Sequence, residues 1–319
     1  MKAILGTMTM GESVFGEDAA AMFRAYDASG GTEVDTAYVY NGGECERIVG
    51  EGLAAFPKGH FSVATKANPR ISGRLDAEAV HAQLGESLKR LSLGSVEILY
   101  LHFPDRSTPV RSAIEGCAEL YAQGKFKELG VSNFPLSLVE EMFPLCDELG
   151  CPMPTVYEGV YNALSRKAEN ELFPALDGLG MRFYAYNPLA GGMLTGRYAD
   201  PGAQAEVGRF ANRPNYKSRY WKDSYFEAVA LLSGACAAEG VPMAEASLRW
   251  LASHSALDSS RGDGVIVGAS KPSHLQKNLA SLAAGPLSAS IAEAFEAAWL
   301  LTAADAPEYF RFYDHGKAV

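Results

Sequence analysis

The sequence predicts a (β/α)8 TIM barrel with extra helices and a long loop after the seventh strand. Eight short apolar segments of strand-like composition alternate with segments whose apolar residues recur at helical spacing, which is typical of a parallel α/β fold. No Gly-x-Gly-x-x-Gly follows a predicted strand, which favours a closed barrel over a doubly wound dinucleotide-binding sheet. No composition shift or linker divides residues 1–319, so we expect a single domain.

Each expected element follows from a local pattern. In the first helix, Ala19, Met22 and Tyr26 lie at helical spacing, and the glycine pair that begins at Gly30 ends it. Asp76 is expected to cap a later helix. The expected strands are residues 3–8, 33–37, 61–65, 96–101, 128–132, 155–160, 182–186 and 264–269. The expected helices are residues 16–29, 44–55, 76–91, 110–123, 135–149, 167–179, 224–239, 242–253, 271–284 and 288–303.

The stretch 187–223 interrupts this alternation. It is polar and rich in glycine, arginine and tyrosine. Loops of this length are usually lids or binding segments, so we expect it to contribute to a site.

The composition narrows the class of protein. The formal net charge of −10 argues against a general nucleic-acid or anionic-membrane surface. No run approaches the roughly 18 apolar residues of a membrane-spanning helix, and the apolar start of the chain is too short for a signal peptide. Five scattered cysteines without Cys-x-x-Cys favour reduced thiols in a cytoplasmic protein. No spacing typical of a metal site is present.

Four polar residues lie at or just beyond the carboxyl ends of three consecutive predicted strands. Asp35 lies near the end of the second strand and Tyr40 just beyond it, Lys66 follows the third strand and His102 follows the fourth. The carboxyl ends of barrel strands form the catalytic face, so these side chains should converge. A neighbouring ammonium stabilises a phenolate and makes a tyrosine a better proton donor, and a carboxylate would hold that ammonium in place. With His102 donating or accepting a hydrogen bond, the group would present a proton donor to a carbonyl.

Other interpretations of these residues stay open. Tyr38 is a rival for the role of Tyr40, although it could simply pack against the barrel. Taken singly, a lysine at a strand end is most often a solvated charge. Lys66 could also form a Schiff base in a barrel lyase, which borohydride trapping would reveal.

Later strand ends offer groups that suit a dinucleotide. Ser132, Asn133 and Glu158 can hydrogen-bond a planar amide, and Tyr186 offers a flat aromatic face. The glycine-rich stretch 187–197 and the helix start at 270–278 place backbone amides and basic side chains where barrels bind phosphate, although the latter could be an ordinary helix cap. The relevant residues are Asn187, Leu189, Gly191, Gly192, Arg197, Ser270, Lys271, His274, Lys277 and Asn278.

The sequence resembles the aldo-keto reductase superfamily over essentially its whole length, and most closely the aflatoxin-aldehyde and succinic-semialdehyde reductases. The segments that carry the resemblance are residues 35–40, 65–67, 100–105, 124–134, 171–174, 183–192 and 309–311. The resemblance implies reduction of aldehydes or ketones by NADPH on a (β/α)8 barrel. An alternative within the same superfamily is an NADPH-bound regulatory or sensing subunit with weak catalysis.

The resemblance also implies a role for each site residue. Tyr40 would be the general acid, tuned by Lys66 and Asp35, and His102 would orient the carbonyl. The nicotinamide would be held by Ser132, Asn133 and the residue at 158, and would stack on Tyr186. The phosphates and adenosine would lie on residues 187–197, Arg209 and residues 270–278. Because Arg197, Arg209, Lys271, His274 and Lys277 are basic, NADP is favoured over NAD. The substrate would contact Tyr40, His102, Tyr216, Arg219 and Arg311.

Two features depart from the family. The glutamine of strand six is Glu158 here, and an ionised carboxylate cannot donate a hydrogen bond to a carboxamide oxygen. The chain also continues for eight residues beyond Arg311, as a cover for the site or as a disordered appendage. We expect a small carbonyl compound as the substrate and no nucleic-acid or membrane partner, and we leave a homodimer open.

Overall fold

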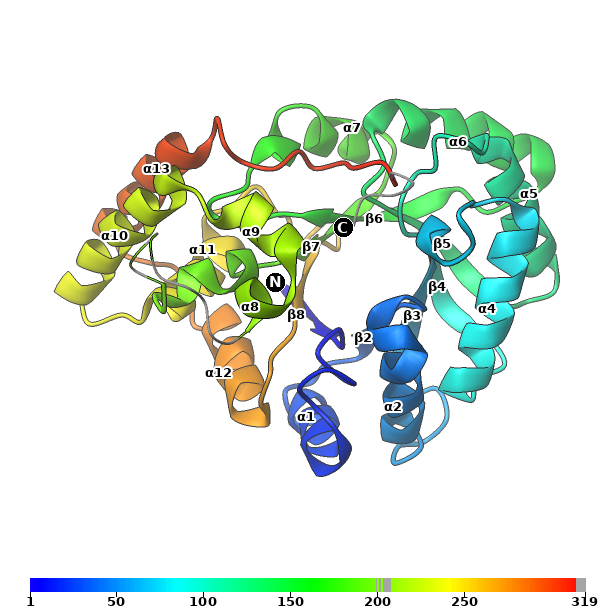
Figure 1. Cartoon of the computed structure of the whole chain (residues 1–319), viewed down its shortest axis with the longest axis horizontal. Helices are drawn as coiled ribbons and strands as arrows, with labels where there is room; N and C mark the ends of the chain where they lie inside the picture. Colours follow the sequence, from blue (N-terminus) through cyan, green and yellow to red (C-terminus); the bar gives the residue numbers. More distant parts are fainter. Residues whose placement is uncertain (199, 201, 203–207, 314–319) are drawn as a thin grey trace.

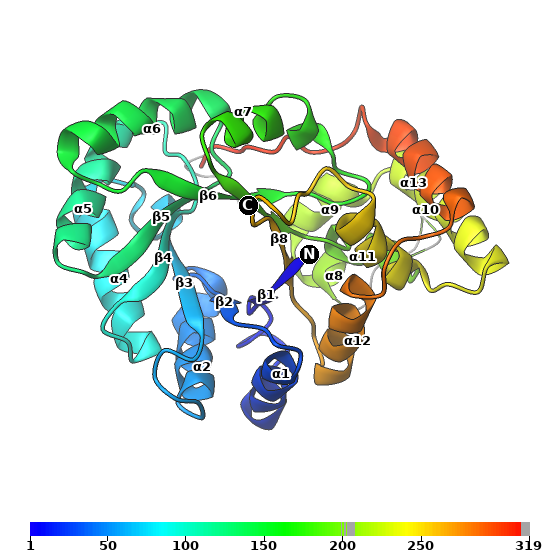
Figure 2. The same ribbon diagram turned by 180° about the vertical axis from the view of Figure 1, so that it is seen from behind.

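The eight strands form a closed parallel barrel in which each strand pairs with its neighbours in the sequence and β1 pairs with β8. The computed structural model describes residues 1–198, 200, 202 and 208–313. Figures 1 and 2 show the ring of strands with helices outside it. The predicted TIM-barrel fold is therefore confirmed. The strands are β1 (Lys2–Gly6), β2 (Glu33–Asp35), β3 (Ser62–Ala67), β4 (Val96–Leu101), β5 (Phe126–Ser132), β6 (Pro154–Val160), β7 (Arg182–Tyr186) and β8 (Gly264–Val267).

The helices lie on the outer face of the barrel because each buries one apolar side. In α4 the side chain of Asp76 accepts a hydrogen bond of 2.9 Å from the backbone N–H of Ala79, as the predicted cap requires, and Val80, Leu84 and Leu88 are buried. The helices are α1 (Gly16–Ala28), α2 (Glu44–Leu53), α3 (Pro69–Ser72), α4 (Ala77–Leu91), α5 (Val110–Ala122), α6 (Leu136–Leu149), α7 (Leu172–Gly178), α8 (Arg209–Asn212), α9 (Pro214–Tyr220), α10 (Asp223–Ala238), α11 (Met243–Ser253), α12 (Pro272–Leu282) and α13 (Ala289–Thr302).

The predicted helix over residues 167–179 is wrong as a single element. The structure divides it into the 3-10 turn η2 (Lys167–Glu169) and α7. α7 begins two residues before Pro174, so this proline, which has no N–H to donate, lies in the first turn, where that N–H would have no partner within the helix. The stretch 187–223 also contains more regular structure than a loop, namely the 3-10 segment η3 (Ala190–Thr195) followed by α8 and α9.

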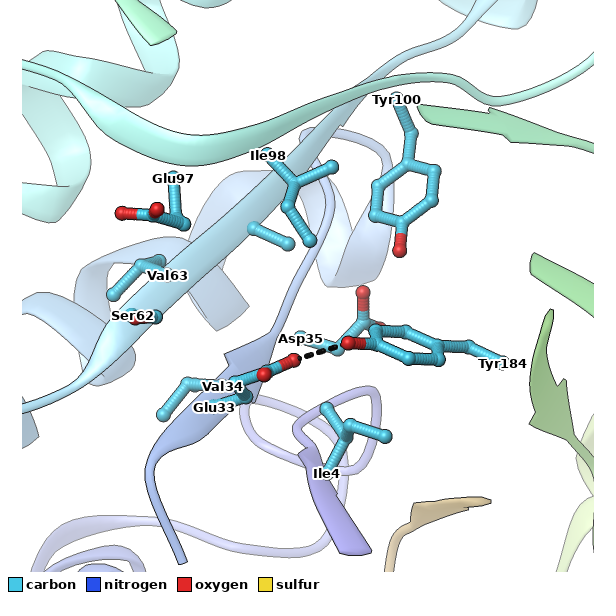
Figure 3. A pocket seen from close by; sticks show the side chains of 11 residues that line it. Ile4, Glu33, Val34, Asp35, Ser62, Val63, Glu97, Ile98, Tyr100 and Tyr184 are labelled. Carbon is cyan, nitrogen blue, oxygen red and sulfur yellow. Dashed lines mark hydrogen bonds between the residues drawn. The ribbon is translucent and has the colours of Figure 1, made fainter. Parts of the chain in front are cut away.

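Large side chains fill the barrel below the candidate site. Tyr100 and Tyr184 lie across the interior, and Gly130 makes room because a Cβ there would lie 2.4 Å from the Tyr100 ring. Figure 3 shows a small pocket at the amino ends of β2, β3 and β4, where the hydroxyl of Tyr184 donates to Glu33 (2.7 Å). This pocket lies at the amino-terminal end of the barrel interior. Asp35 separates it from the polar side chains at the carboxyl end.

The C-terminal segment crosses the carboxyl end of the barrel. It runs from α13 towards the loops that follow β4 and β5 (Figure 1). The backbone N–H of Arg311 donates to the carbonyl of Asn133 (2.9 Å), and that of Tyr313 donates to Pro104 (3.0 Å). The described part of the tail therefore covers one side of the mouth, and residues 314–319 lie outside the described residues.

Neither a single membrane-spanning helix nor a metal-binding group of side chains is present among the described residues. No single helix among them has the length and apolar character needed to cross a membrane, although α10 and α11, bent by 95°, meet that test as a pair by length and composition alone. In the same residues, no three side chains of the metal-binding types lie close enough together to hold an ion.

Candidate active site

A buried lysine lies between two acids at the carboxyl end of the barrel. Lys66 of β3 donates to Asp35 Oδ1 of β2 and to the carbonyl of Thr36 (2.8 Å), and its Nζ lies 3.3 Å from Glu158 Oε2 of β6. The Lys66 side chain is 0% exposed. In a strand, alternate side chains face the same way, so these inward positions on three strands meet at one level.

The protonation states of Lys66, Asp35 and Glu158 depend on one another. Burial lowers the pKa of Lys66, but the attraction of Asp35 and Glu158 outweighs burial and raises it, so the ammonium stays charged. Burial raises the pKa of Asp35, although Lys66 opposes this. Lys66 is thus a paired cation, which makes it a poor nucleophile for a Schiff base.

Tyr40 lies beside this lysine, as the sequence predicts. It begins the turn η1 (Tyr40–Gly43), and its ring centroid is 5.4 Å from Lys66 Nζ and 6.0 Å from the His102 ring. The next residue, Asn41, adopts a positive φ of 51° and donates two hydrogen bonds to the loop after β1, which fixes the turn. The structure therefore brings Asp35, Tyr40, Lys66 and His102 together.

Burial raises the pKa of Tyr40 well above its usual value, and Asp35 and Glu158 raise it further. This direction is opposite to the acidification by Lys66 that the sequence suggested, because burial is the largest influence and Lys66 is itself paired with Asp35. Tyr40 consequently holds its proton throughout the neutral range and remains a donor.

The rival tyrosine lies elsewhere. The Tyr38 ring packs against the guanidinium of Arg90, whose carbon is 4.3 Å from the ring centroid. Arg90 also binds Glu46 on α2 (3.3 Å), so Tyr38 belongs to the shell between the barrel and its helices. Of the two rival tyrosines, Tyr40 and not Tyr38 faces the buried lysine.

Hydrogen bonds fix the tautomer of His102. Asn68 Oδ1 accepts from the backbone N–H of Arg70 (2.9 Å), so the other end of this amide, Nδ2, faces His102 Nδ1 (2.9 Å) as a donor. Nδ1 is then an acceptor, and the ring proton lies on Nε2. Burial, Lys66 and Arg70 lower the pKa of His102 well below its usual value, so the ring is neutral. His102 can therefore donate through Nε2 to a carbonyl oxygen.

The ends of β5 and β7 meet beside this group. Asn133 follows Ser132 with a φ of 62°, and its Nδ2 donates to the carbonyl of His102 (3.0 Å) and to Ser132 Oγ (2.8 Å). The Tyr186 hydroxyl donates to Asn133 Oδ1 (2.7 Å). Ser132, Asn133 and Tyr186 thus lie together beside the group that contains Lys66, Asp35 and Glu158.

The glycine-rich turn after β7 has a tight backbone. Asn187, Ala190, Gly191 and Gly192 all have positive φ values, and a Cβ on Gly191 would lie 2.6 Å from the ring of Tyr216. Leu189, Gly191 and Gly192 are half-buried at this turn.

Arg209 and Tyr216 hold each other in place. Arg209 Nη1 donates to Asn187 Oδ1 (2.9 Å) and to the Tyr216 hydroxyl (3.1 Å), which itself donates to Asn187 Oδ1 (3.2 Å). Tyr216 is buried. Both residues, predicted to touch cofactor and substrate respectively, therefore bind protein groups beside the mouth.

Basic side chains at the start of α12 are exposed and have no acidic partner among the described residues. Lys271, His274 and Lys277 are exposed, and none of them forms an ion pair with any residue that the structure describes. Ser270 is exposed beside them and Asn278 is half-buried, while Arg197 is exposed on the segment after η3. The mouth therefore has two basic regions, one on the segment after β7 and one at the start of α12, after β8.

Arg219 of α9 is a cation that has no acidic partner among the described residues. Its guanidinium lies 5.9 Å from the Tyr216 ring centroid and forms no ion pair within the described residues. Burial lowers the pKa of Arg219, but the tyrosines around it, Tyr186 first, outweigh burial and raise it. A half-buried guanidinium without a carboxylate is suited to an anion that arrives from outside.

A family model described as the Aldo/keto reductase family matches residues 2–300. The chain belongs to this family. It is 44% identical over 321 residues to aflatoxin B1 aldehyde reductase member 2 of Homo sapiens, which covers 97% of this chain and 89% of that protein. It is 43% identical over 320 residues to the Homo sapiens aldo-keto reductase family 7 member A3, covering 97% and 96%. The resemblance predicted from sequence is confirmed, and the chain is an oxidoreductase.

A solved structure shows the same fold. Glycerol dehydrogenase AKR11B4 from Gluconobacter oxydans superposes with a TM-score of 0.73 at 22% identity, covering 96% of this chain and 92% of that one. At this identity, the likeness concerns the barrel and not the substrate.

Sequence reasoning missed two groups around this reductase site. Asn68 lies two residues after Lys66, so the strand alternation placed it on the same side and was a usable signal. Arg213 binds Glu12 (3.1 Å) and Asn41 Oδ1 (3.2 Å), and so ties the segment after β7 to the turn that carries Tyr40. Nothing local in the sequence indicates that second contact.

Proposed function

We propose that this protein reduces aldehydes or ketones to alcohols with NADPH, and that Tyr40 is the proton donor. The observation that carries the proposal is the neutral hydroxyl of Tyr40 beside a fully buried Lys66–Asp35 pair, with His102 across from it. Family membership supports it, as do the two human relatives above, one of which is named as an aldehyde reductase.

The chain offers groups that fit the cofactor. Glu158 Oε2 is a buried polar atom to which no described residue hydrogen-bonds, and it lies on the site's inner wall. Tyr186 supplies an aromatic face, and Lys271, His274 and Lys277 supply cations that no described acid neutralises. Bound NADPH would supply the hydride.

The protein's own residues then handle the charge and the proton. Hydride addition at the carbonyl carbon leaves the electron pair of the C=O bond on oxygen, and the Tyr40 hydroxyl gives that oxygen its proton. A new C–H bond and a new O–H bond form, and the product is the alcohol. His102 Nε2–H stabilises the developing charge, and the buried ammonium of Lys66 compensates the phenolate left on Tyr40.

The deciding experiment is oxidation of NADPH, and separately of NADH, against a panel of aldehydes and ketones. We expect turnover with NADPH and a higher Kd for NADH, since the cations after β8 favour a 2′-phosphate. NADPH binding without turnover of any carbonyl would favour the regulatory alternative. Equal dissociation constants for the two cofactors would contradict the NADP assignment.

We also expect a preference for aldehydes that carry a carboxylate, such as succinic semialdehyde or 2-carboxybenzaldehyde. Arg219, without an acidic partner, can bind the far end of such a substrate, and Arg311 lies on the tail beside Asn133. A charge-assisted contact of roughly 1.5–3 kcal/mol gives a ten- to hundredfold preference in kcat/KM over the uncharged analogue, which Arg219→Ala and Arg311→Ala should reduce.

Lys217→Ala is the matched control, because this exposed cation lies on the same short helix as Arg219. It should leave the preference intact. If wild type does not discriminate between the acid and its analogue, or if both arginine variants still do, the anchoring idea fails while the reductase assignment stands.

A further inference from the structure

The polar layer of the barrel contains two acids and one cation. The side chains of Lys66, Asp35 and Glu158 are 0%, 6% and 3% exposed. One ammonium cannot neutralise two carboxylates, and an uncompensated carboxylate in the protein interior is costly. One of the two acids is therefore expected to keep its proton.

The geometry distinguishes the two acids. Asp35 accepts a direct hydrogen bond from Lys66. Glu158 Oε2 lies 3.3 Å from the same nitrogen without good hydrogen-bond geometry, and the Glu158 carboxyl also faces that of Asp35, to which it can donate only while it holds a proton. Asp35 therefore pairs more closely with the ammonium of Lys66, and Glu158 is the acid that we expect to keep its proton.

The groups around Glu158 also favour its protonated form. Burial and the charge of Asp35 raise the pKa of Glu158 to about 8, although Lys66 opposes them. Burial also raises the pKa of each tyrosine facing Glu158, so these stay neutral. The titratable or charged groups that face it are Asp35 of β2, Tyr40 of η1, Lys66 of β3, Tyr100 of β4 and Tyr186 of β7.

We propose that Glu158 is a neutral carboxylic acid in the folded protein near pH 7 and donates a hydrogen bond to the carboxamide of bound nicotinamide. The ligand in this inference rests on the proposed function, whereas the proton rests on the buried layer alone. A protonated carboxyl has one donor and an acceptor, and therefore meets an amide much as a glutamine does. Ionised Glu158 can only accept, so cofactor affinity should fall as the pH rises.

The test measures the Kd of NADPH by fluorescence titration from pH 7 to 9.5 for wild type and Glu158→Gln. If binding requires a proton on a group with a pKa near 8, the wild-type Kd rises about tenfold between pH 7 and 9. The Kd of Glu158→Gln should stay nearly constant. The series starts at pH 7 because the 2′-phosphate itself titrates near pH 6.

Glu46→Gln is the matched control. Glu46 is fully buried like Glu158, but it binds Thr65 (2.6 Å) and Arg90 (3.3 Å) outside the barrel interior. Its variant should keep the wild-type slope of Kd against pH. A constant Kd in wild type, or an equal rise in Glu158→Gln, overturns the proposal.

A second measurement needs no cofactor. The pKa of Glu158 is raised on folding, so the stability it contributes is fully present below its unfolded value and is lost as the pH rises through about 8. From pH 7 to 9, the Tm of wild type should therefore fall more than that of Glu158→Gln. Equal falls overturn the proton assignment. If NADPH does not bind at any pH, the proposed function and the ligand assignment fail, and the Tm comparison still decides where the proton lies.

Discussion

Tyr40→Phe is expected to lower kcat/KM for carbonyl reduction by roughly a hundred- to ten-thousand-fold, the usual worth of a positioned general acid. The ring remains beside Lys66, and only the proton donor is lost. Because only the hydroxyl is removed and the ring keeps its place beside Lys66 and His102, NADPH affinity and Tm should stay close to the wild-type values. Stopped-flow turnover, with fluorescence titration of NADPH, measures both quantities.

Tyr38→Phe is the natural comparison. Its ring packs on Arg90, away from the catalytic layer, so this variant should turn over at nearly the wild-type rate. A Tyr40→Phe enzyme with full rate, combined with an inactive Tyr38→Phe, would reverse the assignment of the proton donor. The raised pKa of Tyr40 also predicts that the donor is not lost to ionisation below about pH 10.

The position of this tyrosine was predictable because barrel geometry is regular. Once eight strands are recognised, their carboxyl ends must lie on one face, so Asp35, Lys66 and His102 had to approach one another. The same regularity placed Ser132, Asn133 and Tyr186. These predictions needed only the strand ends and not the details of packing.

Charge balance was not predictable in this way. The sequence suggested that Lys66 would acidify Tyr40, whereas burial raises the pKa of Tyr40, and the charges of Asp35 and Glu158 add to that direction. Which inward residues share a level depends on the stagger between β3 and β6, which lie on opposite sides of the ring. No local pattern encodes that stagger.

Contacts between segments that are far apart in the sequence could not be predicted either. The bond from Arg213 to Asn41 joins segments 172 residues apart. Local patterns also failed inside the predicted helix at 167–179, where the chain forms η2 and then begins α7 with Pro174 in its first turn. Sequence periodicity therefore predicts which strand ends carry the site residues. The pKa values of these residues and the contacts between the surrounding loops depend on tertiary packing.

Lys66→Met should be the most destabilising single change in the site. It removes the cation that lies between Asp35 and Glu158, so that neither buried acid can ionise with a compensating charge beside it. Breaking a buried ion pair from one side typically costs roughly 3–5 kcal/mol, which for a domain of this size is a fall in Tm of roughly 5 °C or more at pH 8. Thermal unfolding followed by circular dichroism measures it, and Lys125→Met, at a half-exposed lysine outside the barrel, should cost little.

The pH dependence separates charge from packing in this variant. Without Lys66, the folded-state pKa values of both acids rise further above their unfolded values, so stability is retained at low pH and lost as the pH rises through those values. The difference in Tm from wild type should therefore be small at pH 5 and large at pH 8. Adding Asp35→Asn and Glu158→Gln to Lys66→Met makes the layer neutral and should recover most of the loss at pH 8. A loss that is equal at both pH values and is not recovered by these substitutions would mean that Lys66 stabilises the barrel by filling space rather than by balancing charge.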